Sequence, residues 1–381
     1  MDKSLLTKSD FSHKYFSTVK KLIENSNRIL VWGDEDTDGI TSTAIMLRIL
    51  KKIGKKADYF IPSRKKDGIG ISENGLKRIK NKKFDLIITV DCGSVNSKEI
   101  AALIKRKMKI IITDHHIPYN NLIAGVPYIN PHILKTKKFQ NLSGAGIAFV
   151  LGQYLLNEFN VCKNYSESLN CDKKSIFLAG LGTKCDRVNE NEISSLLIGN
   201  IKKYGKYFPE FHSLGIVESD LCSVVTSSKT RISRNTMVEI FTEKADISED
   251  KKTDYIKICY EKARDYRKRV NEIYRNIKSG IELTGKEKRI LIVDKKIEYK
   301  YIGVLASMLT EEISLPVCIV GRIENKLMGE CRSKIPYNWV NELKMMKEFF
   351  ISWGGHPQAA GFILKGDKVE HFIIAFKSVH S

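Results

Sequence analysis

The sequence predicts an α/β protein with three parts: a doubly wound, mainly parallel N-terminal sheet domain, a long linker helix, and a smaller C-terminal α/β domain. Three observations predict this fold class. Short apolar runs alternate with helical patterns in the first half of the chain. These runs are apolar throughout, which is typical of parallel strands that are covered on both faces. A long amphipathic pattern then intervenes before the α/β pattern resumes.

Four apolar runs are the predicted strands of the first half: 28–33 (RILVWG), 57–62 (ADYFIP), 84–90 (FDLIITV) and 109–113 (KIIIT). Helical spacing of apolar residues is found between and after them, at 40–54, 95–107, 143–159 and 175–182. An order of strand, helix and strand implies right-handed crossovers, and it therefore predicts a doubly wound sheet.

A single amphipathic helix is predicted near residues 251–281, where apolar residues recur at three- and four-residue spacing. Its basic side is typical of a solvated face, with contact to nucleic acid as the alternative. Beyond it we predict strands at 290–294, 316–320 and 326–332, helices at 301–313 and 337–349, and a glycine-rich loop at 353–362. The predicted domains are residues 1–248 (catalytic), 249–285 (linker helix) and 286–381 (C-terminal).

The charge of the chain favours an anionic partner. The 381 residues include 64 Lys and Arg against 44 Asp and Glu, which gives a formal net charge of +20. Nucleic acid is the leading candidate, although a lysine-rich composition can also reflect the codon bias of a genome.

The compartment can also be predicted. No apolar run approaches the roughly 20 residues of a membrane span, and the first residues lack the apolar stretch of a secretory signal. We therefore expect a cytoplasmic protein without membrane association. The eight cysteines include no CxxC pair, so we expect reduced thiols that form neither a cysteine-bound zinc site nor a disulfide framework.

Acidic residues and histidines follow the predicted strands. The segment 34–39 (DEDTDG) follows the first strand, Asp91 follows the third, 114–116 (DHH) follows the fourth, and Asp186 comes near the end of SIFLAGLG. The carboxyl ends of parallel strands share one edge of a sheet, where ligands bind. Clustered carboxylates repel one another and are costly to desolvate, so we expect cations among them.

A pair of divalent cations fits this pattern, because two metals can share a carboxylate, activate a water and hold a phosphoryl oxygen. Oxygen and imidazole ligands favour Mn²⁺, with Mg²⁺ second and zinc third. Each piece alone has a simpler explanation, since an Asp after a strand is a common helix cap. An acidic loop can also be a solvated turn, although DEDTDG lacks the later Glu of an EF-hand. The four clusters together favour the metal site.

The same residues carry a family resemblance. The motifs are YFIPSRKKDGIGIS (59–72), VDCGS (90–94), TDHH (113–116), LSGAGIAF (142–149), LAGLGTKCDRV (178–188) and GGHPQAAGF (354–362). With them the chain resembles the DHH phosphoesterase superfamily, in its RecJ-like branch of single-strand-specific exonucleases with the DHH-associated C-terminal domain. The resemblance extends from about residue 28 to residue 364.

The resemblance implies roles for the clustered acids and histidines. Metal ligands would be Asp36, Asp38, Asp91, His115 and Asp186, with Asp91 bridging the two metals and Asp34 as a weaker candidate. His116 would face the scissile phosphate as a hydrogen-bond donor or acid. Asp114 would orient a neighbouring histidine, as metal-bound imidazoles require.

The resemblance also implies substrate contacts. In the C-terminal domain, phosphate would be held by Arg332, by His356 and by the backbone amides of Gly354 and Gly355. The alternative for this glycine-rich segment is a tight turn before an edge strand. Ser143 opens a helix, and it either serves phosphate or only caps the helix.

Two departures from the family pattern concern the grip on the substrate. The RecJ-like branch usually carries a PRxNAxGR-like stretch, and here 227–239 keeps Arg231 and Arg234 as weaker substrate candidates without the Asn-Ala-Gly portion. The sequence also ends soon after the C-terminal domain, without the extra oligonucleotide-binding barrel of larger bacterial exonucleases. We therefore expect weaker affinity, or a partner that supplies the grip.

The expected function is that of a metal-dependent phosphodiesterase, a RecJ-like exonuclease that degrades single-stranded nucleic acid. DNA is favoured over RNA, and the 5′ end over the 3′ end. One alternative is a small-substrate phosphoesterase of the same superfamily, acting on short oligoribonucleotides, 3′-phosphoadenosine 5′-phosphate or a cyclic dinucleotide. The other is a scaffold that binds partner proteins of replication or DNA repair.

Overall fold

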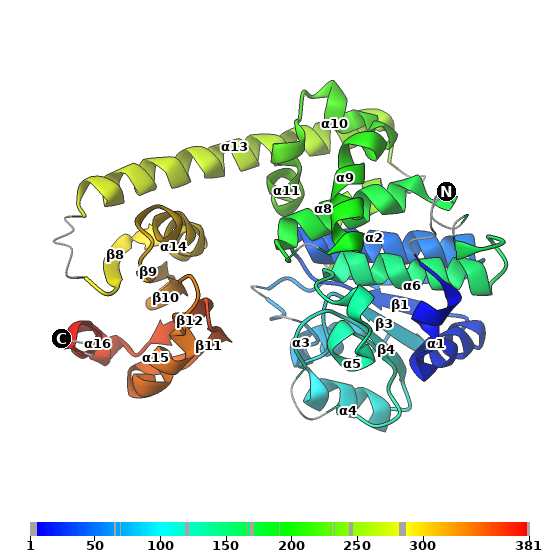
Figure 1. The fold of residues 1–381 in the computed structure, drawn as a ribbon, viewed down its shortest axis with the longest axis horizontal. Coiled ribbons are helices and arrows are strands. Elements are labelled where there is room, and N and C mark those ends of the chain that lie inside the picture. Colours follow the sequence, from blue (N-terminus) through cyan, green and yellow to red (C-terminus); the bar gives the residue numbers. More distant parts are fainter. Residues whose placement is uncertain are drawn as a thin grey trace. The chain divides into compact units, whose positions relative to one another are not determined.

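The structure is a computed structural model of the chain. It describes residues 6–64, 66–68, 70–118, 122–165, 167, 171–189, 191–228, 230–231, 233–243, 247–281 and 287–378. The chain folds into two compact units, residues 1–263 and 264–381. Each unit is an α/β structure, as the sequence predicts (Figure 1).

The sheet of the first unit is parallel throughout and has the strand order β2-β1-β3-β4-β5. Its strands are β1 (Ile29–Trp32), β2 (Ala57–Phe60), β3 (Leu86–Val90), β4 (Lys109–Thr113) and β5 (Tyr128–Ile129). The first four fall within the predicted apolar runs, whereas the two-residue strand β5 was not predicted. Residues of β1 and β3 are buried without exception, which confirms that both faces of the sheet are covered.

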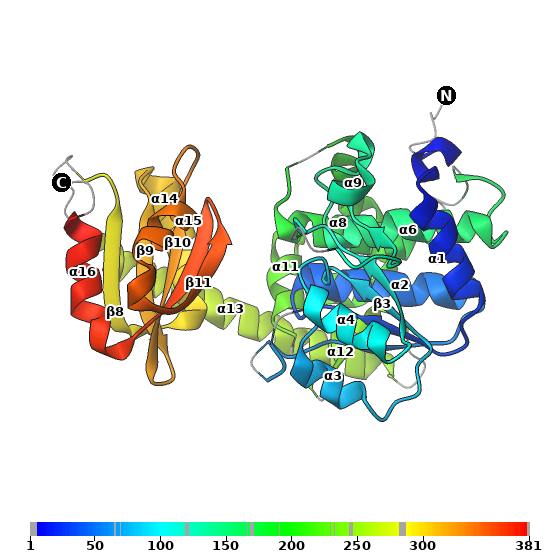
Figure 2. The ribbon, with the colours of Figure 1, turned by 90° about the horizontal axis from the view of Figure 1, so that it is seen from below.

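Helices cover this sheet on both faces (Figures 1 and 2). Side chains of Ile29 and Val31 pack in one hydrophobic cluster with α1 (Lys14–Glu24), α2 (Thr37–Lys52) and α6 (Gly144–Glu158). Their neighbours Leu30 and Trp32 pack in a second cluster with α3 (Glu73–Ile79) and α4 (Ser97–Lys105). Successive strand residues point to opposite faces, so the predicted doubly wound arrangement is confirmed.

A helical layer completes the first unit beyond α2 and α6. The buried helix α8 (Lys173–Asp186) contains the predicted helix 175–182 and packs against α2, α6 and α9 (Glu192–Tyr204). The smaller elements are α5 (Pro131–Leu134), α10 (Pro209–Ser213), α11 (Glu218–Thr226), α12 (Thr236–Phe241) and the antiparallel pair β6 (Thr230–Arg231) and β7 (Arg234–Asn235).

The long amphipathic helix is α13 (Glu249–Ser279). Its apolar residues belong to two cores: Ile256 and Cys259 pack in the first unit, and Val270 and Ile273 pack in the second. The division between the two units therefore falls inside this helix. The limits predicted for three separate domains, 1–248, 249–285 and 286–381, stay a prediction.

The second unit contains a mixed sheet with the order β11-β12-β10-β9-β8. Its elements are β8 (Ile290–Glu298), α14 (Tyr299–Ile313), β9 (Val317–Ile323), β10 (Lys326–Arg332), α15 (Trp339–Met345), β11 (Phe350–His356), β12 (Ala359–Leu364) and α16 (Val369–Ser378). Only β8 and β9 are parallel; the other described pairs are antiparallel.

The prediction of a glycine-rich loop at 353–362 was wrong, because this segment lies in the hairpin of β11 and β12. Along β12, the residues Ala360, Phe362 and Leu364 are buried while their neighbours are half-buried. That period of two is typical of a strand with one face on the core. The glycines hide it in the sequence, since glycine is normally depleted in strands.

The expectation of eight reduced thiols was also wrong. Two disulfides join Cys162 to Cys171 and Cys185 to Cys222, while the remaining four cysteines are buried and free. Neither pair has a sequence signature, because the partners are 9 and 37 residues apart and are brought together by the fold. In the part of the chain that is described, no helix has the length and apolar character required to cross a membrane.

Candidate metal centre

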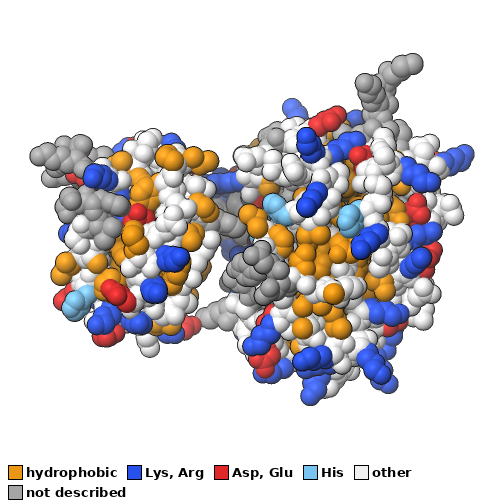
Figure 3. All heavy atoms as spheres, turned by 60° about the horizontal axis from the view of Figure 1, so that its bottom comes forward, with side chains coloured by type: hydrophobic (Ala, Val, Ile, Leu, Met, Phe, Trp, Pro, Cys, Tyr) orange, Lys and Arg blue, Asp and Glu red, His pale blue; other side chains and the backbone are white. Residues whose placement is uncertain are grey.

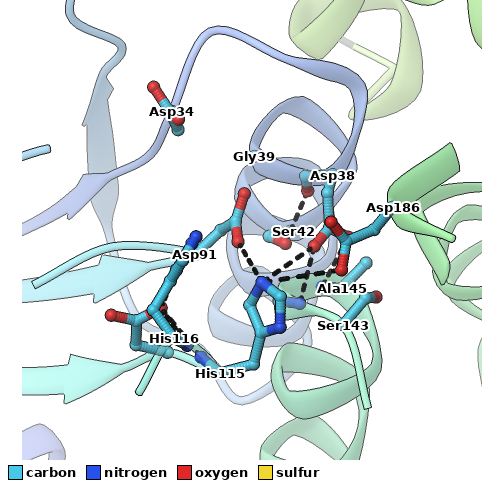
Figure 4. A network of polar contacts seen from close by, with 12 residues as sticks. Asp34, Asp38, Gly39, Ser42, Asp91, His115, His116, Ser143, Ala145 and Asp186 are labelled. Atoms are coloured by element: carbon cyan, nitrogen blue, oxygen red, sulfur yellow. Dashed lines mark hydrogen bonds and ion pairs between the residues drawn. The ribbon is translucent and has the colours of Figure 1, made fainter. Parts of the chain in front are cut away.

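The acidic residues converge where the connections of the sheet change direction. The connection from β1 passes through α2 on one face of the sheet, and the connection from β3 passes through α4 on the other face. Adjacent strands whose connections diverge in this way leave a crevice at their carboxyl ends, which is the usual ligand site of such folds. Asp34, Asp36 and Asp38 follow β1, and Asp91 follows β3 at this point. Figure 4 shows Asp34, Asp38 and Asp91 of this group.

Three overlapping groups of side chains could each hold a cation, because their ligand atoms lie within 4.8 Å of one another. The groups are Asp34, Asp36 and Asp91; Asp91, His115 and His116; and Asp38, His115 and Asp186. We refer to these seven residues as the metal centre. Each of them was singled out from the sequence, and the fold brings them together.

His115 lies in the middle of this cluster (Figure 4). Its Nε2 is 3.2 Å from Asp91 Oδ1, 3.6 Å from Asp186 Oδ2 and 3.9 Å from Asp38 Oδ2. One imidazole nitrogen therefore faces three carboxylates from three different parts of the chain. Burial lowers the pKa of His115, which favours the neutral imidazole that binds metals.

Asp38 is held by the N-terminus of α6. Its carboxylate accepts hydrogen bonds from the backbone N–H of Gly144 (2.6 Å) and of Ala145 (2.9 Å), at the positive end of the helix. Ser143 caps this helix by accepting from Gly146 N and contacts the hydroxyl of Thr183. Ser143 is fully buried, which favours the capping role, and a contact with substrate phosphate stays a prediction.

Two glycines allow the acids to pack closely. A Cβ on Gly144 would lie 2.5 Å from the Cβ of Asp91, and one on Gly182 would lie 2.6 Å from Asp38 Oδ1. Asp91 itself has a φ of 60°, a left-handed conformation that is strained for a residue with a Cβ. The strained backbone at Asp91 and the missing side chains at the two glycines thus allow the carboxylates to lie close together.

The electrostatics of the cluster fit a divalent cation. Asp91 Oδ1 and Asp186 Oδ2 are buried and accept no hydrogen bond from the described residues. Burial, and then the charges of Asp186 and Asp36, raises the pKa of Asp38 to about 8. Burial and the neighbouring aspartates likewise raise the pKa of Asp91 well above its usual value. A cation of high charge would satisfy both orphaned oxygens and reverse these shifts.

Asp114 is different, because the protein compensates its charge fully. Its carboxylate accepts from the backbone N–H groups of Ser94 (2.8 Å), His115 (2.8 Å) and His116 (3.2 Å), and it contacts His116 Nδ1 at 2.8 Å. Burial opposes its charge, but the hydrogen bond with His116 and the two histidines lower the pKa of Asp114 to about 2.

The pKa of His116 shifts in the opposite direction to that of Asp114. Its hydrogen bond with Asp114, acting against burial, raises the pKa of His116 to about 9. With Nδ1 occupied by Asp114, the ring keeps its Nε2 available, and the side chain is 46% exposed. The histidine that Asp114 orients is therefore His116, and this ring is positioned to donate a proton.

Two residues of the site were missed in the sequence. Arg64 Nη2 lies 2.6 Å from Asp34 Oδ2 and 2.8 Å from Asp36 Oδ2. Asn130 is fully buried and donates from Nδ2 to Ser94 Oγ (2.8 Å) and to the carbonyl of His116 (2.9 Å). Arg64 comes soon after the predicted strand β2, so a search of the residues that follow each strand could have found it, whereas Asn130 follows the two-residue strand β5, which has no signal in the sequence.

Two arginines among the predicted substrate contacts form ion pairs within their own units. Arg234 stacks on the ring of Tyr59 and forms ion pairs with Asp58 and Glu239, which indicates a structural role in the first unit. Arg332, in the second unit, pairs with Glu330 at 2.8 Å. The side chains of Arg231 and His356 lie outside the described residues.

The glycines of β11 in the second unit differ from each other. Gly354 has open space where a Cβ would be, and Gly355 has a φ of 136° together with the carbonyl oxygen of Ala359 at 2.5 Å from a built Cβ. Gly355 is thus required by the backbone, whereas Gly354 leaves its backbone accessible.

Comparisons with known proteins agree with this fold. The model of the DHH family, N-terminal domain, matches residues 28–181, and the model of the DHHA1 domain matches residues 287–380. The chain therefore belongs to the DHH superfamily.

Within that superfamily the chain is RecJ-like. The single-stranded-DNA-specific exonuclease RecJ of Bacillus subtilis is 28% identical over 92% of this chain and 45% of its own length. The RecJ of Thermus thermophilus is 25% identical over 91% of this chain and 51% of its own length. This chain thus spans about half the length of these curated relatives. A crystal structure of exonuclease RecJ bound to manganese matches with a TM-score of 0.77 at 22% identity, covering 100% of this chain and 97% of that one.

Proposed function

We propose that the chain is a metal-dependent phosphodiesterase that degrades single-stranded DNA as an exonuclease, with the 5′ end favoured. The observation that carries the proposal is the convergence of seven acidic and histidine side chains into three overlapping ligand groups at the carboxyl edge of the sheet. The relatives support the substrate, since both are named single-stranded-DNA-specific exonucleases.

Two divalent cations are proposed as cofactors, with Mn²⁺ preferred to Mg²⁺. The three ligand groups share Asp91 and His115, so neighbouring cations could share ligands. Solved RecJ structures are described as bound to Mn²⁺ or to Mg²⁺, which supports these two metals. When bound, such cations lower the pKa of a water and stabilise charge on phosphoryl oxygens.

The protein's own contribution to the chemistry is a positioned proton. Asp114 accepts from Nδ1 of His116 and keeps its ring protonated at neutral pH, since the pKa of His116 is raised to about 9. Nε2–H can then donate to an oxygen of the scissile phosphate or to the leaving oxygen. Asn130 donates a hydrogen bond to the carbonyl of His116 and so helps to hold the loop that carries this histidine.

The charge of the chain supports a polymeric substrate. Affinity for a polyanion increases with each phosphate that is contacted, and the net charge here is +20. On the face shown in Figure 3, Lys and Arg side chains are spread over both units. The experiment must therefore compare long strands with short ones.

The test is digestion of matched DNA and RNA strands, single and double, long and short, with opposite end labels and with Mn²⁺. We expect release of mononucleotides from the 5′ end of long single-stranded DNA. Asp91→Ala should abolish it, whereas Asp254→Asn, on the exposed side of α13, should not. Equal rates on single and double strands would refute the proposal.

Other outcomes select the alternatives. A preference for dinucleotides over long strands would select a small-substrate phosphoesterase. Protein that neither binds a metal nor hydrolyses any strand would select a scaffold that binds replication or repair proteins.

A further inference from the structure

The short helix α11 contacts both segments that bring ligands to one side of the metal centre. Cys222 of α11 forms a disulfide with Cys185, the residue that precedes Asp186 at the end of α8. The carbonyl of Cys222 accepts a hydrogen bond from Thr37 Oγ1 (3.1 Å), and Thr37 Oγ1 also lies 2.6 Å from Thr226 Oγ1. Thr37 stands between Asp36 and Asp38 in the sequence, so α11 joins these ligands to Asp186.

We propose that the Cys185–Cys222 disulfide is a positioning cross-link that holds Asp186 within reach of the other metal ligands, and that it makes the metal affinity of the chain depend on redox state. The inference rests on the proposed function, because it takes Asp186 as a metal ligand. It concerns a pair of residues to which the family resemblance gives no role.

Asp186 lacks the supports that Asp38 and Asp91 have. Asp38 receives two backbone hydrogen bonds from α6, and Asp91 directly follows a central strand. Asp186 is the last residue of α8, and Arg187 ends the helix in a left-handed conformation with a φ of 56°. Terminal turns of helices lack part of their backbone hydrogen bonds. Within the described part of the chain, no hydrogen bond holds Asp186 Oδ2.

The disulfide lies at this end of α8, next to Asp186. The Cα atoms of Cys185 and Cys222 are 5.6 Å apart, within the range of about 4.4–6.8 Å that disulfides usually span. Lys184, which precedes Cys185, also contacts α11. It forms an ion pair of 2.5 Å with Glu218, which lies one turn before Cys222. That pair is half-exposed, and such pairs contribute little on their own. At the end of α8 the covalent bond is therefore the stronger of these two ties to α11, whose Leu221, Val224 and Val225 are also buried in the same core cluster as α8.

Reduction would remove that tie. A dithiol reductant supplies two electrons and two protons, breaks the sulfur–sulfur bond to give the thiols of Cys185 and Cys222, and becomes a disulfide itself. Both cysteines are partly exposed, so a small reductant can reach them. The end of α8 would then hold Asp186 less firmly, and the cation would lose part of its preorganised ligand set.

The test measures Mn²⁺ binding to the full chain by electron paramagnetic resonance of the free ion, after oxidation with glutathione disulfide and after reduction with a phosphine. We expect the reduced protein to bind Mn²⁺ about 10-fold more weakly, the size that loss of a ligand-orienting contact typically has. The double variant Cys185→Ser with Cys222→Ser should bind weakly in both states. Thiol counting by mass spectrometry confirms which disulfide is present.

The second disulfide provides the matched control. The double variant Cys162→Ser with Cys171→Ser removes a disulfide of the same unit that involves no residue adjacent to a predicted ligand, so it should keep the full difference between oxidised and reduced protein. Equal Mn²⁺ affinity in both redox states, or a Cys185–Cys222 bond that does not form on oxidation, would overturn the inference and leave the proposed function standing. Absence of Mn²⁺ binding in both states would instead overturn the proposed function.

Discussion

Two kinds of buried carboxylate occur side by side at the carboxyl edge of the first sheet. Asp114 receives hydrogen bonds from three backbone N–H groups and from His116, and its pKa falls to about 2. Asp91 is as deeply buried, yet Asp91 Oδ1 accepts no hydrogen bond from the described residues, and burial raises its pKa. Burial alone therefore does not distinguish these two carboxylates, whereas the missing hydrogen bond at Asp91 Oδ1 does.

The largest effect that this comparison predicts concerns Asp91→Asn. We expect Mn²⁺ affinity and phosphodiester hydrolysis to fall more than about 100-fold, because the amide can neither bridge cations nor carry charge. The metal-free variant should nevertheless melt at a higher temperature than the wild type, since a repelled, buried charge is removed. Calorimetry with excess chelator checks this. A lower melting temperature would show that Asp91 is compensated within the protein.

Asp114→Asn should behave in the opposite way. Removing a carboxylate that the protein compensates should lower the free energy of unfolding by about 2 kcal/mol at neutral pH, from the shift of its pKa from 3.8 to about 2. Hydrolysis should fall by up to about 100-fold while His116 loses its partner. Because the folded pKa is lowered, this stability is present above pH 4 and is lost as the pH falls toward 2.

Urea unfolding of wild type and Asp114→Asn at a series of pH values measures that difference. The two proteins should converge in stability only at the acidic end of the series. A difference that is constant from pH 7 to pH 2 would mean that charge compensation at Asp114 has no part in stability.

The same comparison explains what the sequence could reveal. Because β1, β3 and β4 are apolar runs, their ends could be located, and every acid of the metal centre follows such an end or lies near the end of a buried apolar helix. Strand β5 has only two residues, too few to show any pattern, so the contribution of Asn130 was not predicted. Which carboxylates are compensated depends on N–H groups from segments distant in sequence, such as the amide of Gly144 that reaches Asp38.

In the second unit, local sequence composition led to a wrong prediction. Glycines at 354, 355 and 361 favoured a loop, but the partner strand β10 organises the segment as a hairpin. Pairing between strands is a long-range property that local composition does not report. The disulfides are likewise set by the packing of α8 and α11, not by the spacing of their cysteines.

A smaller effect is expected from pH. The pKa of Asp38 is raised to about 8 by burial and by neighbouring charges, so this group is largely protonated at neutral pH without metal. Cation binding must then release a proton, and the apparent Mn²⁺ affinity should increase as pH rises toward 8, by up to about 10-fold per unit. Titration calorimetry in two buffers of different ionisation enthalpy counts the released protons.

Asp38→Asn is the control for this measurement, and it should release fewer protons on binding than the wild type does. Proton release that is unchanged in Asp38→Asn would assign the titration to another group. Affinity that is flat between pH 6 and pH 8 would contradict the raised pKa itself.

The smallest predicted effect distinguishes a residue that positions His116 from a residue that binds the metal. Asn130 is not a ligand, but its amide holds the carbonyl of His116 and the hydroxyl of Ser94. Asn130→Ala should therefore slow hydrolysis by about 10-fold at most, through a less fixed His116, and leave Mn²⁺ affinity unchanged.

A second buried helix-capping asparagine, Asn235, allows the loss of a cap to be separated from the loss of positioning. Asn130 accepts from His132 N at the start of α5, and Asn235 accepts from Met237 N at the start of α12. Both are fully buried, so each alanine variant loses a cap of about 1 kcal/mol. Only Asn130→Ala should alter the pH dependence of the rate, because only it touches the loop of His116. Equal rates and equal pH profiles in the two variants would show that Asn130 acts on stability alone.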